Sequence, residues 1–399
     1  MRLIIVGAGI TGAACAYTAS GLGAQVTLID AERPGRATAA GAGIICPWTA
    51  AVDDPAWYDF ARVAAREYPA VIAGLADQGE ADVSYRRVGA LLLAATGDQP
   101  ARPEQARKLE HADASEHADA SEQADALEQV WQRIAVRSAG APEMGEVSLL
   151  DDGQAQELFP PLRPGAAAVH IAGAARVDGR RLAAALVRAA ARRGATVRTD
   201  PARAATLSCR AGRVTGVSVG GDPVEADAVV AAAGAWTAGF VEPAGVTVNV
   251  VPQRGQIVHI GLGGTDTSRW PVVLPSATGH YLLAFDGSRV VAGATRETGS
   301  GYDVRVTPGG LAEVLTNALS VAPGLSSGTL LETRVGLRPV GPDIRPLLGP
   351  VAGADGLVVA TGLGASGLTM GPRTGAVAAR VALGLPPDLD LAPFDPLRS

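Results

Sequence analysis

The stretch LIIVGAGITGAACAYTASGL, residues 3–22, decides the fold class of this chain. Residues 3–6 form an apolar run of strand length, and residues 13–22 form a run of small residues with the length of a helix. Between the two lies GAGITG at 7–12, and the run QVTLID follows at 25–30. A strand, a glycine-rich turn, a helix and a second strand in this order predict a β-α-β unit that binds a dinucleotide.

Each glycine of the turn has a physical reason to be there. Gly7 permits the tight turn, Gly9 lets backbone N–H groups approach a pyrophosphate at the positive helix end, and Gly12 lets helix and strand pack closely. Asp30, which ends the second strand, would accept hydrogen bonds from ribose hydroxyls, and an acid here disfavours a 2′-phosphate. This motif alone does not separate NAD from FAD, and a plain structural turn is the alternative.

The composition is that of a globular protein. Of 399 residues, 47% are hydrophobic and only 19% are charged, and the length predicts two domains. The net charge is -6 and Lys108 is the only lysine, which argues against nucleic acid and a polybasic membrane patch as partners. Since no apolar run reaches the ~18 residues of a spanning helix and no signal peptide is evident, we expect a cytoplasmic protein.

The three cysteines, Cys15, Cys46 and Cys209, lie far apart and form no CxxC pair. They indicate neither a disulfide framework nor a zinc site. A reducing compartment fits this pattern.

A low-complexity segment at 110–127 reads EHADASEHADASEQADAL. Its period of six matches neither a helix face nor a strand, so we interpret it as a solvated insertion. His111 and His117 would point in different directions on a helix, and we therefore expect no metal site.

Later stretches repeat the style of the first β-α-β unit. Residues 179–194 predict an amphipathic helix, a strand follows at 196–198, and residues 226–233 predict a strand buried on both sheet faces. Residues 357–361 predict another buried strand, and a glycine-rich turn and a helix at 369–383 follow. The dinucleotide-binding domain is therefore expected to be discontinuous in sequence.

Longer strands of a different character occupy residues 85–95, 246–260 and 280–294, and FDGS at 285–288 predicts a hairpin turn. These strands predict a mainly antiparallel sheet in a second domain. The expected boundaries are 1–84, 146–240 and 330–399 for the nucleotide-binding domain, and 85–145 and 241–329 for the second domain, with the insertion at 110–127.

Further motifs follow in order along the chain. They are TAAGAGIICP at 38–47, AARVDGRRLAAAL at 174–186, ADAVVAAAGAW at 226–236, PQRGQ at 252–256, YLLAFDGSRVVAGAT at 281–295, GLRP at 336–339 with Pro342, Asp343 and Pro346, and ATGLGASGLTMGP at 360–372. Over nearly its whole length the chain resembles the FAD-dependent D-amino-acid oxidase family, which includes glycine oxidases, sarcosine oxidases and D-amino-acid dehydrogenases.

The resemblance implies an α/β fold in which a Rossmann-type FAD-binding domain joins a mainly antiparallel substrate domain, as in glutathione-reductase-like flavoproteins. It also implies FAD as cofactor and hydride transfer from an amino substrate to flavin N5. The expected FAD contacts are Gly7, Gly9, Ile10, Thr11, Gly12, Asp30, Ala31, Thr38, Ala39, Gly41, Gly43, Ile44, Ala202, Ala232, Gly234, Trp236, Arg338, Gly362, Gly364, Ala365, Ser366, Gly367, Leu368 and Thr369.

Two sets of residues bear on the reacting end of the site. Gly362, Gly364 and Gly367 would expose N–H groups at a helix start, suited to negative charge at the N1/O2 edge of a reduced flavin. A plain strand-helix turn is the alternative reading of these glycines. Arg338 matches the position at which the family anchors the substrate carboxylate, although a structural arginine is the alternative.

Three aromatic or titratable residues are weaker candidates. Tyr281 would supply a hydroxyl to the carboxylate or roof the pocket, with core packing as an equal alternative. His280 is more often a structural histidine than a base. Trp48 would cover the ring system of the flavin, and an aromatic side chain packed in the core is the alternative. Cys46 is interpreted as a small buried apolar residue.

Departures from the family bear on the reaction. Gly336 stands where sarcosine oxidases carry a cysteine that tethers the flavin, so FAD is expected to be non-covalent. With Lys108 as the only lysine, a lysine linked to oxygen activation is missing, which mildly favours a dehydrogenase over an oxidase. Leu363 and Ala365 stand where relatives place a histidine and a second arginine. The pocket should therefore be roomier and less polar, which disfavours a glycine-like substrate.

We therefore expect an FAD-dependent oxidoreductase that oxidises the C–N bond of an amino acid or related amine to an imine. Oxygen or another redox partner would accept the electrons. Two alternatives stay open. An NAD(P)-dependent dehydrogenase needs only the first motif, and a flavoprotein subunit of a larger dehydrogenase assembly would explain the missing lysine and the repeat.

Overall fold

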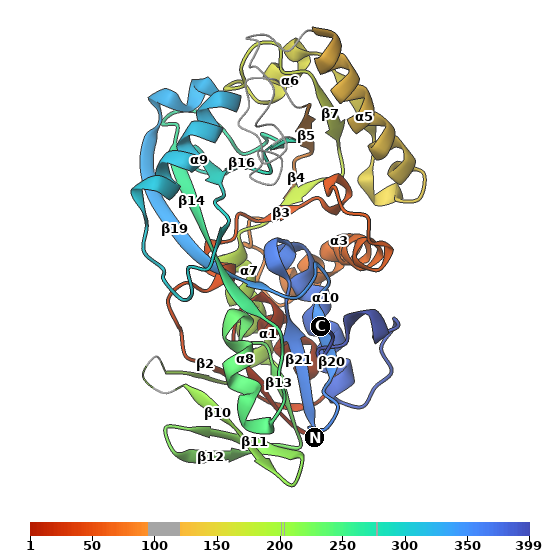
Figure 1. Ribbon diagram of the computed structural model, residues 1–399, viewed down its shortest axis with the longest axis vertical. Coiled ribbons are helices and arrows are strands. Elements are labelled where there is room, and N and C mark those ends of the chain that lie inside the picture. The colour runs from red at the N-terminus through yellow and green to blue at the C-terminus, as the bar shows by residue number, and fades with distance from the viewer. Residues whose placement is uncertain (95–119, 201, 203, 277) are drawn as a thin grey trace.

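The computed structural model describes residues 1–94, 120–200, 202, 204–276 and 278–399 (Figure 1). Lys108, His111, His117 and residues 110–119 of the repeat lie outside the described residues. The rest of the repeat belongs to the helix α5 (Ala120–Ser138). Among the described helices, none combines the length and apolar character that crossing a membrane requires.

A six-stranded sheet forms one part of the molecule, with the strand order β20-β21-β13-β1-β2-β9. Its strands are β1 (Arg2–Val6), β2 (Gln25–Asp30), β9 (Thr196–Thr199), β13 (Ala228–Ala231), β20 (Leu347–Pro350) and β21 (Leu357–Thr361). All neighbours are parallel except β20 and β21. The predicted β-α-β unit and the predicted strands near 228 and 357 are confirmed.

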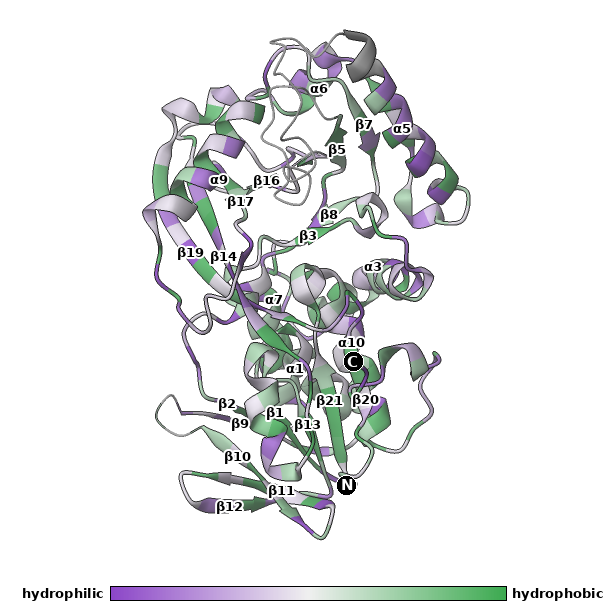
Figure 2. Ribbon diagram, in the orientation of Figure 1, coloured by the Kyte–Doolittle hydropathy of each residue, from purple (hydrophilic) through white to green (hydrophobic). Residues whose placement is uncertain are grey.

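The position of β1 in this sheet marks the ligand site. β1 lies between β13 and β2, so the strand order reverses at its carboxyl end. Open α/β sheets bind ligands in the crevice at this point. Strands β1 and β21 are buried and hydrophobic nearly throughout, as Figure 2 shows for β21.

Four helices pack around this sheet: α1 (Ile10–Gly21), α3 (Pro55–Ala76), α7 (Gly179–Arg192) and α10 (Gly367–Ala382). A Cβ at Gly375 of α10 would lie 2.2 Å from the carbonyl oxygen of Thr11, so glycine is required where α10 crosses α1. The Asp54 carboxylate caps α3 by accepting a 2.9 Å hydrogen bond from the Trp57 N–H.

A nine-stranded sheet forms the other part, with the order β18-β14-β17-β16-β15-β5-β7-β6 and β19 paired to β14. Its strands are β5 (Ala90–Leu93), β6 (Val147–Leu150), β7 (Ala168–Ile171), β14 (Val251–Gly261), β15 (Val272–Pro275), β16 (Tyr281–Phe285), β17 (Arg289–Gly293), β18 (Glu297–Thr298) and β19 (Thr329–Val340). Only the β5–β15 pair is parallel among these described strands. The hairpin at 285–288 is confirmed.

The sheets divide the chain differently from the expected domain boundaries at two points. Strands β6 and β7 fall within 146–240, and β19 apart from Thr329 falls within 330–399, yet all three pair in the nine-stranded sheet. A short apolar strand carries no local signal for the sheet that it joins. We propose that these strands belong to the substrate domain.

The remaining elements connect and extend the two parts. One three-stranded sheet consists of β10 (Ala205–Arg210), β11 (Arg213–Val219) and β12 (Asp222–Glu225). Another consists of β3 (Ile44–Ile45), β8 (Ala175–Arg176) and β4 (Arg86–Arg87). The further helices are α2 (Ala37–Ala40), α6 (Asp152–Leu158), α8 (Thr237–Val241) and α9 (Pro308–Val321). The long strands β14 and β19 reach from one part toward the other (Figure 1). The Leu337 N–H donates 2.8 Å to the Gly35 carbonyl, which ties β19 to the chain after β2.

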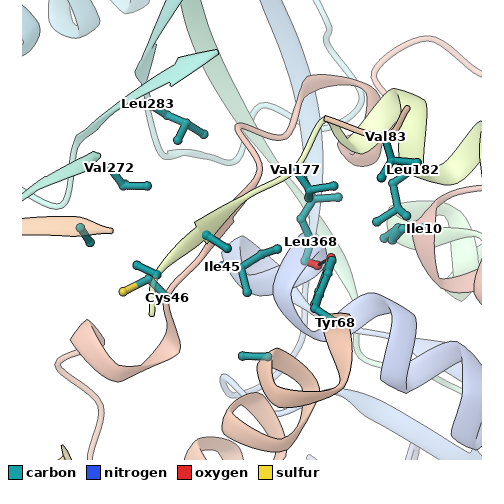
Figure 3. Close-up of a cluster of buried hydrophobic side chains, with 14 of the residues drawn as sticks. Ile10, Ile45, Cys46, Tyr68, Val83, Val177, Leu182, Val272, Leu283 and Leu368 are labelled. Carbon is teal, nitrogen blue, oxygen red and sulfur yellow. Dashed lines mark hydrogen bonds between the residues drawn. The ribbon is translucent and has the colours of Figure 1, made fainter. Parts of the chain in front are cut away.

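An apolar cluster links the two parts beneath the site (Figure 3). It brings Ile10 of α1, Tyr68 of α3 and Leu368 of α10 together with Leu283 of the nine-stranded sheet. Cys46 lies in the same cluster, and burial raises the pKa of its thiol to about 12. The thiol therefore stays protonated and packs as a small apolar group, as expected from the sequence.

Candidate active site

A cavity of about 710 Å³ lies at the carboxyl ends of β1, β13 and β21, and residues of β14 and β19 complete its lining. It brings together segments from both ends and the middle of the chain. Of the residues expected from the sequence, the lining contains Gly7, Gly9, Ile10, Thr11, Asp30, Ala31, Thr38, Gly41, Gly43, Ile44, Ala232, Gly234, Trp236, Tyr281, Arg338, Gly364, Ala365, Gly367 and Leu368.

The glycine turn forms part of the cavity lining. Gly7 has φ +105°, and a Cβ there would lie 2.3 Å from the Ala232 carbonyl oxygen, so a side chain has neither room nor a relaxed backbone. The Ile10 N–H, in the first turn of α1, donates 2.9 Å to Thr38 Oγ1. The backbone of the turn thus faces the cavity closely, with the positive end of α1 behind it.

Asp30 is held in place by backbone donors. Its carboxylate accepts hydrogen bonds of 2.5 Å from the N–H groups of Ala8 and Glu32. Arg36, which also lines the cavity, approaches the carboxylate at 3.5 Å. Because a carboxylate has about four lone-pair directions, ribose hydroxyls can still be accommodated. Arg36 belongs to no sequence motif, so the sequence did not predict it as a residue of the site.

An aromatic pair forms part of the rim. The rings of Trp236 and Tyr302 stack at 5.7 Å between centroids, with 20° between their planes. The Tyr302 hydroxyl donates 3.1 Å to the Ala235 carbonyl, and the Arg33 guanidinium lies 5.8 Å from the Trp236 ring centre. Arg33 and Tyr302 both line the cavity and come from turns with no sequence signature.

Arg338 of β19 also lines the cavity. Its Nη1 donates 2.8 Å to the Thr295 carbonyl and 3.4 Å to Gln253 Oε1. Its guanidinium lies against Gly255 of β14, where a Cβ would be 2.6 Å from the guanidinium carbon and both terminal nitrogens. Burial lowers the pKa of Arg338 from the ordinary arginine value, and the nearby Tyr281 opposes that shift.

Tyr281 begins β16 and stands beside Arg338. A Cβ at Gly293 would lie 2.5 Å from the Tyr281 hydroxyl, so glycine opposite it provides the space. Burial raises the pKa of Tyr281, although the charges of Arg338 and Arg296 pull the pKa down. The hydroxyl is therefore protonated near neutral pH and can donate a hydrogen bond.

Two expected substrate-site residues lie outside this cavity lining. His280 points behind Tyr281 into a separate small cavity, with Nε2 3.5 Å from Glu313 Oε1. Burial lowers the pKa of His280 to about 4. Trp48 is only 2% exposed and packs in the apolar cluster. His280 directly precedes β16 and Trp48 lies in a short 3-10 helix, and the sequence alone did not indicate which side of either segment met the cavity.

Six expected cofactor contacts also fall outside the lining: Gly12, Ala39, Ala202, Gly362, Ser366 and Thr369. A Cβ at Gly12 would lie 1.8 Å from the Gly7 carbonyl oxygen, so Gly12 serves the packing of α1 on the turn. The Thr369 hydroxyl donates 3.0 Å to the Ile44 carbonyl. Ala202 is exposed, whereas Ala204, Ala205 and Thr206 line the cavity instead.

The turn before α10 directs a helix start toward the cavity. Gly362 and Gly364 have φ of +74° and +50°, which glycine adopts without strain. The Thr361 hydroxyl donates 2.9 Å to the Gly234 carbonyl and joins this turn to the one after β13. The first residues of α10, Gly367 and Leu368, line the cavity with the positive helix end.

These features fit FAD. The cavity lining combines a glycine cradle with no room for Cβ atoms, an arginine near a protonated tyrosine, and the starts of two helices. No cysteine is among the described residues of the lining. Gly336, which stands where sarcosine oxidases carry a cysteine that tethers the flavin, lines the cavity. We propose that FAD binds here without a covalent bond.

Comparison with known proteins decides the family. The model of the family DAO, described as FAD dependent oxidoreductase, matches residues 2–381. The chain belongs to the DAO family. As a DAO-family oxidoreductase it uses FAD, so the NAD(P)-dependent alternative is dropped.

Individual relatives match this chain over nearly its whole length. The uncharacterized oxidoreductase YurR of Bacillus subtilis (strain 168) is 44% identical over 98% of both chains. The crystal structure of iminodiacetate oxidase (IdaA) from Chelativorans sp. BNC1 is 45% identical, covers 100% of both chains and superimposes with a TM-score of 0.89. Glycine oxidase from Geobacillus kaustophilus is 26% identical over 100% of this chain and 99% of its own, with a TM-score of 0.79.

Proposed function

We propose that this chain oxidises the C–N bond of an amino acid or related amine that carries a carboxylate. The α-carbon gives up a hydride, the nitrogen loses a proton, and the resulting imine is hydrolysed by water. FAD, when bound, supplies the two-electron acceptor at flavin N5. The observation that supports this proposal is the half-buried guanidinium of Arg338, which lines the cavity together with Tyr281.

Arg338 is suited to orient the substrate. A guanidinium binds a carboxylate through two parallel hydrogen bonds and so fixes the plane of the carboxylate and the direction of its α-carbon. The bond to the Thr295 carbonyl and the packing against Gly255 hold the guanidinium itself in one place. Positioning of this kind lowers the barrier because the reacting carbon is held close to its acceptor.

Tyr281, like Arg338, would bind the substrate carboxylate. Since burial raises its pKa, its hydroxyl donates a hydrogen bond to the substrate carboxylate and does not act as a base. The amine must therefore enter neutral or lose its proton to solvent. Apolar residues Ile257, Leu363 and Leu368 also line the cavity and limit the water around the reacting bond.

Relatives support this reaction class. Glycine oxidase of Pseudomonas aeruginosa (strain PAO1) is 29% identical over 99% of this chain, and the 45% identical structure is an iminodiacetate oxidase. The described cavity lining contains no lysine, which favours an electron acceptor other than oxygen. To measure this preference, the flavin is reduced by substrate under anaerobic conditions, and the rates of its reoxidation by air and by a dye are compared.

A subunit role in a larger assembly is a second candidate. Hydrogen cyanide synthase subunit HcnC of Pseudomonas aeruginosa is 30% identical over 98% of this chain. Under this candidate, the isolated chain turns over slowly, and a partner from the same cell raises its rate. A rate that partners leave unchanged favours a self-sufficient enzyme.

Substitution of Arg338 tests the anchor. We expect Arg338→Ala to raise the KM for carboxylated amines about 10- to 100-fold, as loss of a charged hydrogen bond does, while the flavin content stays near that of the wild type. Arg338→Lys keeps the charge but loses the two-pronged geometry and should recover part of the loss. An unchanged KM in Arg338→Ala would show that the carboxylate binds elsewhere.

A further inference from the structure

Residues 299–306, here called the strap, connect β18 to α9 and carry Tyr302 near their middle. Both ends of the strap are fixed to the nine-stranded sheet. Its start follows β18, which pairs with β14. At its end, the Gln256 side chain of β14 accepts 3.0 Å from the Thr307 N–H and donates 2.8 Å to Thr307 Oγ1. Only the middle of the strap therefore extends away from this sheet.

The middle of the strap contacts two turns beside the six-stranded sheet. In the turn after β13, the Tyr302 ring stacks on Trp236 at 5.7 Å between centroids, and the Tyr302 hydroxyl donates 3.1 Å to the Ala235 carbonyl. In the turn after β2, a Cβ at Gly35 would lie 2.4 Å from Val304 Cγ1, so Val304 packs against this glycine. The strap thus joins the two parts of the molecule at the cavity.

Tyr302 stands between the cavity and solvent. It belongs to the cavity lining, yet it is 52% exposed. Trp236 and Ala235, its partners across the contact, line the cavity as well. Rings that stack at this spacing touch each other, so no ligand passes between Tyr302 and Trp236 while the contact holds. The contact therefore closes this side of the cavity.

A largely buried ion pair holds the strap in this position. Arg254 of β14, only 8% exposed, pairs with Asp303 at 2.7 Å and with Glu297 at 2.6 Å. Asp303 is the neighbour of Tyr302 in sequence and lies outside the cavity lining. Charged hydrogen bonds of this length are strong, so the pair fixes the backbone beside Tyr302 without touching the cavity.

We propose that the strap is a gate for the cofactor, and that FAD enters and leaves the cavity only when Tyr302 parts from Trp236. This inference goes beyond the proposed oxidation of a C–N bond, because it concerns how FAD is retained and holds for any substrate. It rests on non-covalent binding of FAD in this cavity.

The rates of FAD exchange test the gate without turnover. Dissociation is followed by the rise in flavin fluorescence after dilution of the holoenzyme, and association by its quenching when FAD is added back to the apoprotein. We expect Tyr302→Ala to speed both steps about tenfold or more, because a ring stack and a hydrogen bond no longer oppose opening. Tyr302→Phe keeps the stack and should speed both steps less. Wild-type rates in Tyr302→Ala would overturn the proposal.

The association rate separates a gate from two simpler roles. A tyrosine that only contacts bound FAD slows its release and leaves its entry unchanged. A substitution that only destabilises the fold releases FAD faster and binds it no faster. Faster dissociation of FAD from Tyr302→Ala with an unchanged association rate would therefore also overturn the proposal.

A second substitution releases the strap without changing the cavity lining. Asp303→Asn removes the charge that pairs with Arg254, and we expect it to speed both steps about 3- to 10-fold. Val306→Ala is the matched control, because Val306 lies in the same strap, is 47% exposed and is outside the lining. The control should keep the wild-type rates. Wild-type rates in Asp303→Asn would overturn the role of the strap.

The gate and the proposed reaction fail in different ways. If FAD exchange responds as expected and no amine reduces the flavin, the gate stands and the proposed reaction is wrong. If amines reduce the flavin and the exchange rates do not respond, the reaction stands and the gate is wrong. Flavin that stays attached to the denatured chain would show a covalent bond and overturn the gate.

Discussion

The hydroxyl of Tyr68 donates a hydrogen bond to the main-chain carbonyl of Leu368 and joins α3 to the first turn of α10 (Figure 3). In a regular helix that carbonyl would accept from the N–H four residues later, but that residue is Pro372, which has none. Tyr68 therefore satisfies a buried carbonyl that the helix cannot. The bond holds in place the helix start that faces the cavity.

Removal of this hydroxyl should destabilise the protein. We expect Tyr68→Phe to lower the free energy of unfolding by about 1–3 kcal/mol, because the Leu368 carbonyl then stays buried without a donor. Tyr58→Phe on the same helix is the control, since its buried hydroxyl has no partner among the described residues. Denaturant unfolding of both variants measures the difference, and equal losses would contradict this role of Tyr68.

Gly7→Ala should impair FAD binding. A Cβ at this position meets the Ala232 carbonyl oxygen at 2.3 Å with φ at +105°, a strain of at least ~1–3 kcal/mol. Such strain lowers FAD affinity about tenfold or more. The ratio of flavin to protein after purification and a titration with FAD measure the effect. Gly140→Ala, in open space, should keep full occupancy. Full occupancy in Gly7→Ala would refute the role of this turn.

Gly255→Ala should displace the Arg338 guanidinium, which lies 2.6 Å from the position of the new methyl group. We expect kcat/KM for carboxylated amines to fall about tenfold or more, because small displacements of an orienting group are costly. Flavin content and kcat/KM are measured together, with Gly263→Ala in open space as the control. Unchanged kinetics would mean that Arg338 does not orient the substrate.

His280 should contribute to the pH dependence of stability. Its pKa in the folded chain, about 4, lies below the ordinary ~6.5, so its contribution is present above pH ~6.5 and is lost as the pH falls toward 4. Between pH 7 and pH 5 the loss is about 2 kcal/mol. Burial also lowers the pKa of His259 to about 4, so His280→Gln should keep only part of the slope.

Unfolding experiments at several pH values compare His280→Gln with the wild type. A slope in the variant equal to that of the wild type would show that His280 is not the titrating group. The rate of flavin reduction at saturating substrate should not titrate near pH 6.5 through His280, because this side chain lies behind Tyr281.

The local pattern predicted the elements around the FAD cradle well. The helix expected at 179–194 is α7, which spans Gly179–Arg192, and the strand expected at 357–361 has those bounds. Such elements carry strong apolar periodicity and glycine stops, so short-range interactions determine them. The hairpin at 285–288 followed from turn chemistry in the same way.

Features that depend on tertiary packing could not be predicted from the sequence. Arg296 and Tyr302 lie on turns without a motif, and the pairing of β14 with β18 helps to bring that segment to the cavity. The placement of His280 and Trp48 depends on which face of an element meets the cavity. Strands β6 and β7 belong to the nine-stranded sheet through pairings that a short apolar run does not indicate.

Anaerobic mixing of the holoenzyme with carboxylated amines tests the central claim most directly. The account predicts that the visible absorbance of oxidised flavin disappears with iminodiacetate or another carboxylated amine, and that Arg338→Ala needs a much higher substrate concentration for the same loss. A flavin that stays oxidised with every amine and amino acid, in a protein that retains FAD, would contradict the account.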